Sequence, residues 1–189
     1  MIEVYTGAGK GKTTAAIGLA IRALGAGFRV YMMQFMKSLA YSEQKILQGF
    51  SPQLALHTTG KPFFIAKEGM LTEEERKAWD EDVVVFPGGK PPADYRRLMQ
   101  QGFGKAAEAA RSDAWDVVIL DEINVALFFD LVSREEVESL LDDVPPEREL
   151  VLTGRNAPSW LLQRADLITE MKEVRHYYAR GVAERRGIE

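Results

Sequence analysis

TGAGKGKTT, residues Thr6–Thr14, decides how this sequence folds. The stretch follows an apolar segment, Ile2–Tyr5, and leads into TTAAIGLAIRAL, residues 13–24, which is rich in Ala, Ile and Leu on most faces. The first pattern predicts a strand, and the second predicts a helix that packs beside a sheet. A glycine-rich loop between a strand and a helix is the setting of a phosphate-binding loop.

The loop departs from the standard phosphate-binding spacing by one residue. That motif reads GxxxxGK[ST], and Gly11, Lys12 and Thr13 satisfy its end. Thr6, however, occupies the place of the first glycine, and Gly7 lies one position late. The chemistry survives this shift, because glycines still allow successive backbone amides to turn toward an anion and the following helix adds its positive amino-terminal end.

Most side chains of the loop have a role in a candidate nucleotide site. Lys12 can neutralise terminal phosphates, and the Thr13 hydroxyl can reach a magnesium ion. Lys10 adds a second cation, which favours a polyphosphate over a single phosphate. Thr14 is either part of the site or only a helix residue, and a glycine-rich turn without a ligand is the alternative for the whole loop. The residues assigned to the site are Thr6, Gly7, Ala8, Gly9, Lys10, Gly11, Lys12, Thr13 and Thr14.

The rest of the chain alternates between strand and helix patterns. Short apolar runs predict further strands at residues 28–35, 54–59, 116–121, 149–153 and 167–171. A helix is predicted over residues 94–111. Two more are predicted to begin near Thr72 and Ser133, because a glutamate follows each of these residues at the three-residue spacing of a capping box. This alternation predicts one domain, residues 1–189, of the α/β class: a P-loop NTPase-like (RecA-like), doubly wound, mainly parallel sheet with helices on both faces.

Charged residues follow two of the predicted strands. VVILDE places Asp121 and Glu122 directly after four apolar residues, where a carboxylate can orient or ligate magnesium. TGR, residues 153–155, follows another buried strand at the edge where such sheets bind ligands, so Arg155 is a candidate phosphate clamp. Acidic residues at strand ends are common, and a surface ion pair is the alternative for the arginine. Both assignments therefore depend on the neighbouring phosphate loop.

Composition argues against several classes of protein. The 24 Lys and Arg residues against 28 Asp and Glu give a net charge of -4, so no overall positive field attracts nucleic acid or an anionic membrane. Without cysteine there is no disulfide, thiolate metal site or cysteine nucleophile. No apolar run approaches the roughly 20 residues of a membrane span, and the first residues lack a signal-peptide pattern. We therefore expect a cytoplasmic protein with no nucleic acid or membrane partner.

These features predict a Mg-nucleotide site without naming a reaction, because switches, kinases, motors and transferases share them. The guanine-reading [NT]KxD pattern does not occur in the sequence, which favours ATP over GTP. From the residues alone, a P-loop ATPase or kinase-like phosphotransferase and a non-catalytic binding module both remain open.

Several segments taken together resemble the ATP:corrinoid adenosyltransferases. They are TGAGKGKTTAA from Thr6, QFMK at residues 34–37, VVILDEIN at 117–124, ELVLTGRNAP at 149–158 and ADLITEM at 165–171. The resemblance covers nearly the whole chain, and the displaced first glycine is itself typical of that family.

The resemblance implies transfer of the 5′-deoxyadenosyl group of ATP to the cobalt of a reduced corrinoid, with release of tripolyphosphate. Cobalt(I) is then the nucleophile, so the protein supplies positioning and charge stabilisation. The groups implied are cations for the leaving triphosphate and oxygen donors for the magnesium of Mg-ATP. The cations are Lys12, Lys10 and Arg155; the oxygen donors are Thr13 and Glu122, with Asp121 as a supporting carboxylate.

Further expectations concern the corrinoid and the assembly. Phe63, or Phe64 in its place, is the candidate to press on the lower face of the cobalt and displace its axial ligand, leaving a four-coordinate cobalt(II) that is easier to reduce. Two core aromatics are the alternative. Relatives often begin with a helix that helps cover the corrinoid, whereas this sequence starts at the first strand. Either the cover is absent, or another segment supplies it, with PGGKPPAD, residues 87–94, as the candidate. The resemblance also implies a homodimer and an electron-donating reductase as a partner.

Overall fold

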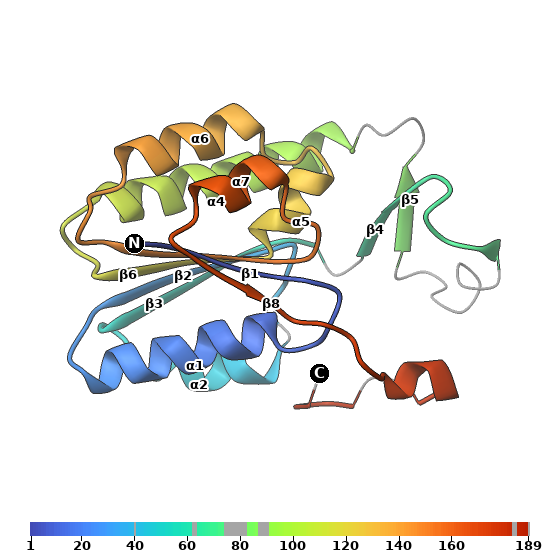
Figure 1. The fold of residues 1–189 in the computed structure, drawn as a ribbon, viewed down its shortest axis with the longest axis horizontal. Coiled ribbons are helices and arrows are strands. Elements are labelled where there is room, and N and C mark those ends of the chain that lie inside the picture. Colours follow the sequence, from blue (N-terminus) through green and yellow to red (C-terminus); the bar gives the residue numbers. More distant parts are fainter. Residues whose placement is uncertain (40, 62–63, 74–82, 87–90, 183–184, 189) are drawn as a thin grey trace.

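A parallel sheet forms the centre of the molecule. The computed structural model describes residues 1–39, 41–61, 64–73, 83–86, 91–182 and 185–188 (Figure 1). The sheet has the strand order β3-β2-β6-β7-β1-β8, and every pairing between neighbouring strands in it is parallel. The strands are β1 (Ile2–Thr6), β2 (Val30–Phe35), β3 (Leu54–Thr59), β6 (Val117–Asp121), β7 (Glu149–Thr153) and β8 (Leu167–Glu170).

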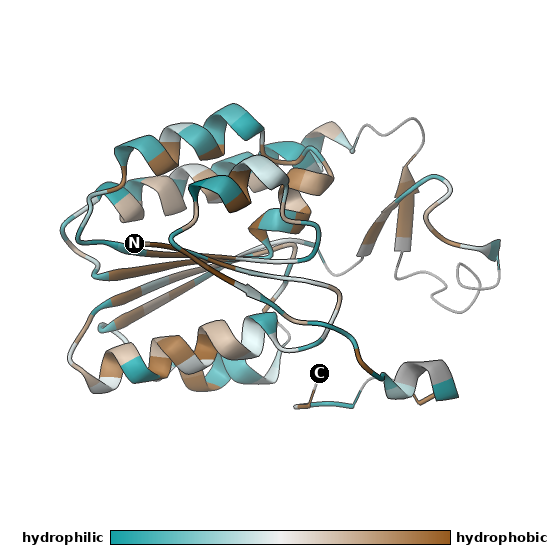
Figure 2. Cartoon of the chain, viewed as in Figure 1, coloured by the Kyte–Doolittle hydropathy of each residue, from teal (hydrophilic) through white to brown (hydrophobic). Residues whose placement is uncertain are grey.

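Helices cover both faces of this sheet. α1 (Lys12–Gly25) and α2 (Ser42–Gln48) lie on one face (Figure 1). The helices on the other face are α4 (Ala93–Arg111), α5 (Ile123–Phe128), α6 (Arg134–Asp143) and α7 (Ser159–Arg164). The strands between them are largely apolar, whereas the outer helix surfaces carry many hydrophilic residues (Figure 2). This is the doubly wound, P-loop NTPase-like α/β fold that the alternating pattern predicts.

The core consists of two buried clusters, because side chains of each strand alternate between the faces. Met32 and Ile119 belong to the cluster beneath α1, and the next residues along the same strands, Met33 and Leu120, belong to the cluster beneath α4. Residues buried on both faces explain why β2, β6 and β7 appear in the sequence as continuous apolar runs.

Most expected elements are present, with small shifts of their ends. β2 begins at Val30 rather than at Phe28, which is exposed. The capping box at the start of α6 is confirmed: Ser133 N donates to Glu136 Oε2 at 2.7 Å, and Glu136 N donates to Ser133 Oγ at 3.2 Å. The glutamate three residues after Thr72 lies outside the described residues. None of the described helices is long and apolar enough to cross a membrane.

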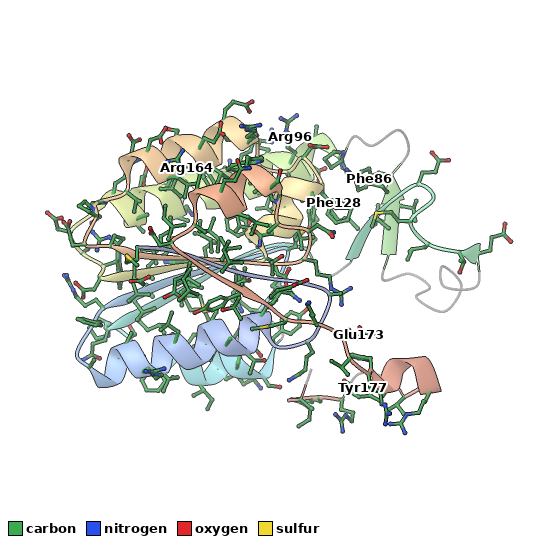
Figure 3. The ribbon with its side chains drawn as sticks, in the orientation of Figure 1. Phe86, Arg96, Phe128, Arg164, Glu173 and Tyr177 are labelled. Atoms are coloured by element: carbon green, nitrogen blue, oxygen red, sulfur yellow. The ribbon has the colours of Figure 1, made fainter. Side chains whose placement is uncertain are left out.

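A second, two-stranded sheet, which the sequence pattern does not predict, lies beside the main sheet. It pairs β4 (Phe64–Lys67) with β5 (Val83–Phe86) in parallel (Figure 1). Lys67 Nζ donates to the carbonyl of Phe128 at 2.7 Å, and the rings of Phe86 and Phe129 lie 6.0 Å apart. Figure 3 shows Phe86 and Phe128 at the junction between this small sheet and α5. The small sheet is therefore attached to the end of α5.

The strand order decides which loops meet. In a parallel sheet all carboxyl ends lie at one edge, and ligands of open α/β sheets bind there. β7 lies between β1, which leads into the glycine loop, and β6, which ends at Asp121. β2 lies on the other side of β6. The loops after β1, β2, β6 and β7 are consequently neighbours.

Candidate active site

The glycine loop is shaped by close contact with the segment after β8. Gly9 N donates to the Met171 carbonyl at 2.7 Å, and Met171 N donates to the Thr6 carbonyl at 2.8 Å. A Cβ on Gly7 would lie 2.4 Å from the Met171 oxygen, and a Cβ on Gly9 would lie 2.8 Å from the Lys172 carbonyl. Gly7 also has φ 99°, a conformation that favours glycine. The spacing of these glycines therefore follows from packing as well as from phosphate chemistry.

Lys12 lies inside the curve of the loop. Its Nζ donates to the carbonyls of Gly7 at 2.8 Å and Gly9 at 2.7 Å, and the residue is buried. Burial lowers the pKa of Lys12, an effect that the carboxylate of Glu122 opposes and the guanidinium of Arg155 reinforces. The ammonium is thus held where backbone amides surround an anion in loops of this kind.

Asp121, at the end of β6, is the most fully bonded side chain of the site. Its Oδ1 accepts hydrogen bonds from Thr13 Oγ1 at 2.8 Å and from Thr153 Oγ1 at 2.7 Å. Its Oδ2 accepts from Lys37 Nζ at 2.8 Å and from Gln34 Nε2 at 3.2 Å. The carboxylate is completely buried, so these four donors replace the water that it loses.

Glu122 has a different environment from its neighbour. It adopts the left-handed conformation with φ 65°, which turns the chain from β6 into α5, and its N–H donates to Thr153 Oγ1 at 3.0 Å. A Cβ on Gly154 would lie 3.2 Å from Glu122 Oε2, so glycine makes room for this carboxylate. Burial, with the charge of Asp121, raises the pKa of Glu122, while Lys37, Lys12 and Arg155 lower it. Glu122 is therefore an acidic group whose ionised form depends on nearby cations.

The remaining predicted cations and loop residues are more exposed. Lys10, Ala8 and Thr14 lie on the solvent side of the loop and helix start. Arg155 is exposed after β7, close enough to shift the pKa of Lys12 and of Glu122. The loop that carries Arg155 is fixed by Asn124, whose Nδ2 donates to the Gly154 carbonyl at 3.0 Å.

Four polar residues of the site were missed as functional candidates. Lys37, Gln34 and Thr153 contact Asp121, and Asn124 contacts Gly154, the residue before Arg155. The signal available for Gln34 and Lys37 was a polar side chain at the end of an otherwise apolar strand, QFMK. That signal is weak on its own, because it does not say which strand lies next to β2.

The two corrinoid candidates fall at the start of the small sheet. Phe63 lies outside the described residues, and Phe64 is the first residue of β4. The assignment of an aromatic residue to the cobalt therefore stays a prediction. Of the candidate cover at residues 87–94, residues 87–90 lie outside the described residues, and Ala93 and Asp94 are the first residues of α4.

The oxygen donors around the loop fit magnesium. Mg²⁺ prefers oxygen ligands and usually takes one or two carboxylates together with substrate phosphates and water. The Thr13 hydroxyl and the carboxylates of Asp121 and Glu122 supply such donors next to the loop, and Asp121 is bonded directly to Thr13.

Comparison with known proteins gives the family. The family model described as ATP:corrinoid adenosyltransferase BtuR/CobO/CobP matches residues 1–189. A corrinoid adenosyltransferase of Sinorhizobium sp is 32% identical over 100% of this chain and 79% of its own length. The corrinoid adenosyltransferases of Salmonella typhimurium and Escherichia coli K12 are 31% and 28% identical, each over 100% of this chain and 85% of their own length. Among solved structures, an ATPase from the type III secretion system of pathogenic bacteria is 12% identical, with a TM-score of 0.35 over 95% of this chain and 48% of that chain. The chain belongs to the ATP:corrinoid adenosyltransferase family.

Proposed function

We propose that this protein transfers the 5′-deoxyadenosyl group of Mg-ATP to the cobalt(I) of a reduced corrinoid and releases tripolyphosphate. The observation that carries the proposal is the 2.8 Å hydrogen bond between Thr13 of the phosphate loop and Asp121, in a chain that matches this family from end to end. It joins the phosphate loop to an acidic group at the edge where the sheet binds ligands.

The reaction balances without any nucleophile from the protein. The electron pair of cobalt(I) forms the bond to the ribose C5′ atom, and the C5′–O bond breaks with its electrons on the leaving tripolyphosphate. Cobalt changes formally from the +1 to the +3 state, so no other oxidant or reductant takes part in this step. The protein is left with two tasks, alignment of the two substrates and stabilisation of the leaving group.

We assign the stabilisation of the leaving group to cations of the loop region. Lys12 lies within the loop, Arg155 lies at the end of β7, and Lys10 lies on the outer side. Magnesium, when bound, neutralises charge on the phosphates, and Thr13 and Glu122 are its proposed protein donors. Asp121 orients the Thr13 hydroxyl by accepting its hydrogen bond.

The corrinoid is proposed to lie at the carboxyl edge, near the small sheet. β4 begins at Phe64, and this sheet is anchored to α5, which directly follows Glu122. Phe63 or Phe64 would then approach the lower face of the cobalt. The chemistry needs such a group, because a four-coordinate cobalt(II) accepts an electron more easily than one that keeps its axial ligand.

The assembly and location are also proposals. We propose that residues 1–189 act as one domain, that two copies form a homodimer, and that a reductase supplies the electron that produces cobalt(I). A cytoplasmic location agrees with the strongly reducing character of cobalt(I). Family membership supports these proposals.

The direct test is an anaerobic incubation of the protein with Mg-ATP and chemically reduced cobalamin. Light-sensitive adenosylcobalamin should form together with one equivalent of tripolyphosphate, and omission of the chemical reductant should abolish both products. Formation of ADP and phosphate without adenosylation would contradict the proposal and place the protein among ATP hydrolases.

A further inference from the structure

Lys37 is a buried cation at the phosphate loop. It follows the end of β2, and its Nζ donates to Asp121 Oδ2 at 2.8 Å and to Thr13 Oγ1 at 3.4 Å. Only 14% of its side chain is exposed. The ammonium therefore lies against the same hydroxyl that is proposed to bind the metal of Mg-ATP.

The backbone at Lys37 is held in place by its neighbours. Met36, the preceding residue, has φ 57°, which turns the chain sharply after β2. A Cβ on Gly60 would lie 2.5 Å from Lys37 N, so the end of β3 packs directly against this turn. The Lys37 ammonium also lies 5.3 Å from the centre of the Tyr41 ring. These contacts direct the side chain toward the loop rather than toward solvent.

Lys37 forms an ion pair with Asp121, in which Nζ lies 2.8 Å from Oδ2. An ammonium group carries three N–H donors. Two of them are directed to Asp121 and Thr13, and no third acceptor within the described parts of the chain is hydrogen-bonded to it.

We propose that Lys37 contacts the triphosphate of ATP and stabilises the tripolyphosphate as it leaves. The inference rests on the proposed function, because it concerns the same nucleotide site. A phosphate oxygen bound beside Thr13 comes within reach of an ammonium that is already 3.4 Å from the hydroxyl. Negative charge on the leaving group grows as the C5′–O bond breaks, so a fixed cation lowers the barrier more than it strengthens substrate binding. Lys37 thereby adds a largely buried cation to Lys12, Arg155 and Lys10, of which Lys10 and Arg155 are exposed.

The competing explanation is that Lys37 only neutralises the buried carboxylate of Asp121. A buried charge left without its partner is costly, so a simple loss of activity in Lys37→Met would not separate the two roles. The variant Lys37→Met/Asp121→Asn removes both charges and restores the balance. If Lys37 only neutralises Asp121, the double variant should bind tripolyphosphate as tightly as Asp121→Asn does.

The experiment measures binding of tripolyphosphate and of adenosine, separately, by calorimetry in the absence of a corrinoid. Lys37→Met should weaken tripolyphosphate binding roughly 10- to 100-fold, as expected for a lost hydrogen bond between charged groups, and leave adenosine binding within about twofold. Lys37→Arg should retain most of the tripolyphosphate affinity. Lys37→Met/Asp121→Asn should bind tripolyphosphate more weakly than Asp121→Asn by a similar factor. Lys45→Met, which removes an exposed lysine from α2, controls for the change in net charge.

Two results would overturn the inference. One is unchanged tripolyphosphate affinity in Lys37→Met. The other is equal affinity in Asp121→Asn and in the double variant, which would make Lys37 only a partner of Asp121. Both readouts are independent of adenosylation. If the wild-type protein does not adenosylate cobalamin but Lys37→Met still weakens tripolyphosphate binding, the proposed function fails, while the contact between Lys37 and the triphosphate stands.

Discussion

The hydroxyl of Thr13 donates a 2.8 Å hydrogen bond to Oδ1 of Asp121, a residue 108 positions later in the chain. The same carboxylate accepts from Thr153, Lys37 and Gln34, so all of its hydrogen-bonding capacity toward the protein is engaged. Glu122, the next residue, has a left-handed backbone with φ 65°, and its N–H joins the same network by donating to Thr153 Oγ1 at 3.0 Å. Adjacent carboxylates of one motif therefore have different surroundings, and we propose that Asp121 organises the site while Glu122 binds a ligand.

Glu122→Gln and Asp121→Asn should accordingly fail in different ways. Glu122→Gln should raise the magnesium concentration needed for half-maximal activity by about tenfold or more, with little change in folding. Asp121→Asn leaves buried Lys37 without its counter-charge and should lower the free energy of unfolding by about 3 kcal/mol. Magnesium titration of activity and urea denaturation measure the two effects. An unchanged magnesium titration in Glu122→Gln would exclude this residue as a metal donor.

Lys12→Ala should remove most of the affinity for Mg-ATP. The ammonium lies between two loop carbonyls at the centre of the phosphate site, and loss of charged hydrogen bonds should weaken binding roughly 10- to 100-fold. Lys10→Ala is the matched comparison, because Lys10 lies on the same loop but is exposed, and its effect should be smaller. Calorimetric titration with Mg-ATP measures the affinity of both variants. Equal losses of affinity would show that the buried position of Lys12 does not explain its contribution to binding.

Gly7→Ala should disable the loop, whereas Gly18→Ala should not. The methyl group of an alanine at position 7 would lie 2.4 Å from the Met171 carbonyl oxygen. The alanine would also have to adopt a φ of 99°, which favours glycine. On Gly18, in the middle of α1, a methyl group meets nothing within 4 Å and should add up to about 1 kcal/mol of helix stability. Nucleotide binding and thermal denaturation of the two variants provide the comparison. Normal ATP binding by Gly7→Ala would mean that the segment after β8 can move away from the loop.

These glycines also show what local sequence can predict. The strand, the loop and the helix were expected because each depends on residues close together in the chain, and the structure confirms all three. The contact between Gly7 and Met171 could not be predicted from local sequence, because it depends on the pairing of β8 with β1.

Glu149→Gln should change how stability depends on pH. Burial raises the pKa of Glu149 to about 7, and the charge of Glu3 adds to the shift. An acid whose pKa is higher in the folded than in the unfolded protein stabilises the fold fully below the unfolded value, near 4.5, and this contribution is lost as the pH rises through about 7. Glutamine, which stays neutral, should therefore raise the stability relative to wild type at pH 8 but not at pH 4.5. After allowance for solvent screening the gain should be at most about 1 kcal/mol. Urea denaturation at both pH values measures it, and equal differences at the two pH values would contradict the assignment.

Phe63→Ala should reduce the spectroscopic signal of four-coordinate cobalt(II) cobalamin bound together with ATP, if Phe63 is the residue that displaces the axial ligand. Phe64→Ala is the matched control, since it removes the same ring from the neighbouring position. Magnetic circular dichroism of both variants identifies the residue. A signal that persists in Phe63→Ala and disappears in Phe64→Ala would transfer the role to the first residue of β4, and persistence in both would remove these aromatics from the mechanism.

The small sheet of β4 and β5 is not predicted by the local sequence pattern. Each strand has only four residues, too few to give a clear strand pattern in the sequence, and yet the two strands pair in parallel. Its position depends on contacts with Phe128 and Phe129 at the end of α5. Contacts of that kind leave no periodicity in the sequence.

Local patterns predicted the first strand, the glycine loop, the helix that follows and most strands of the main sheet, because strand and helix patterns and glycine spacing act over a few positions of the chain. The groups that lie around the loop follow from the tertiary structure. The order β3-β2-β6-β7-β1-β8 places the end of β2 beside Asp121, and this brings Lys37 to the hydroxyl of Thr13. The physical reason is that neighbouring strands are selected by burial of the whole sheet between two helix layers, an energy to which every core residue contributes and which no single motif records.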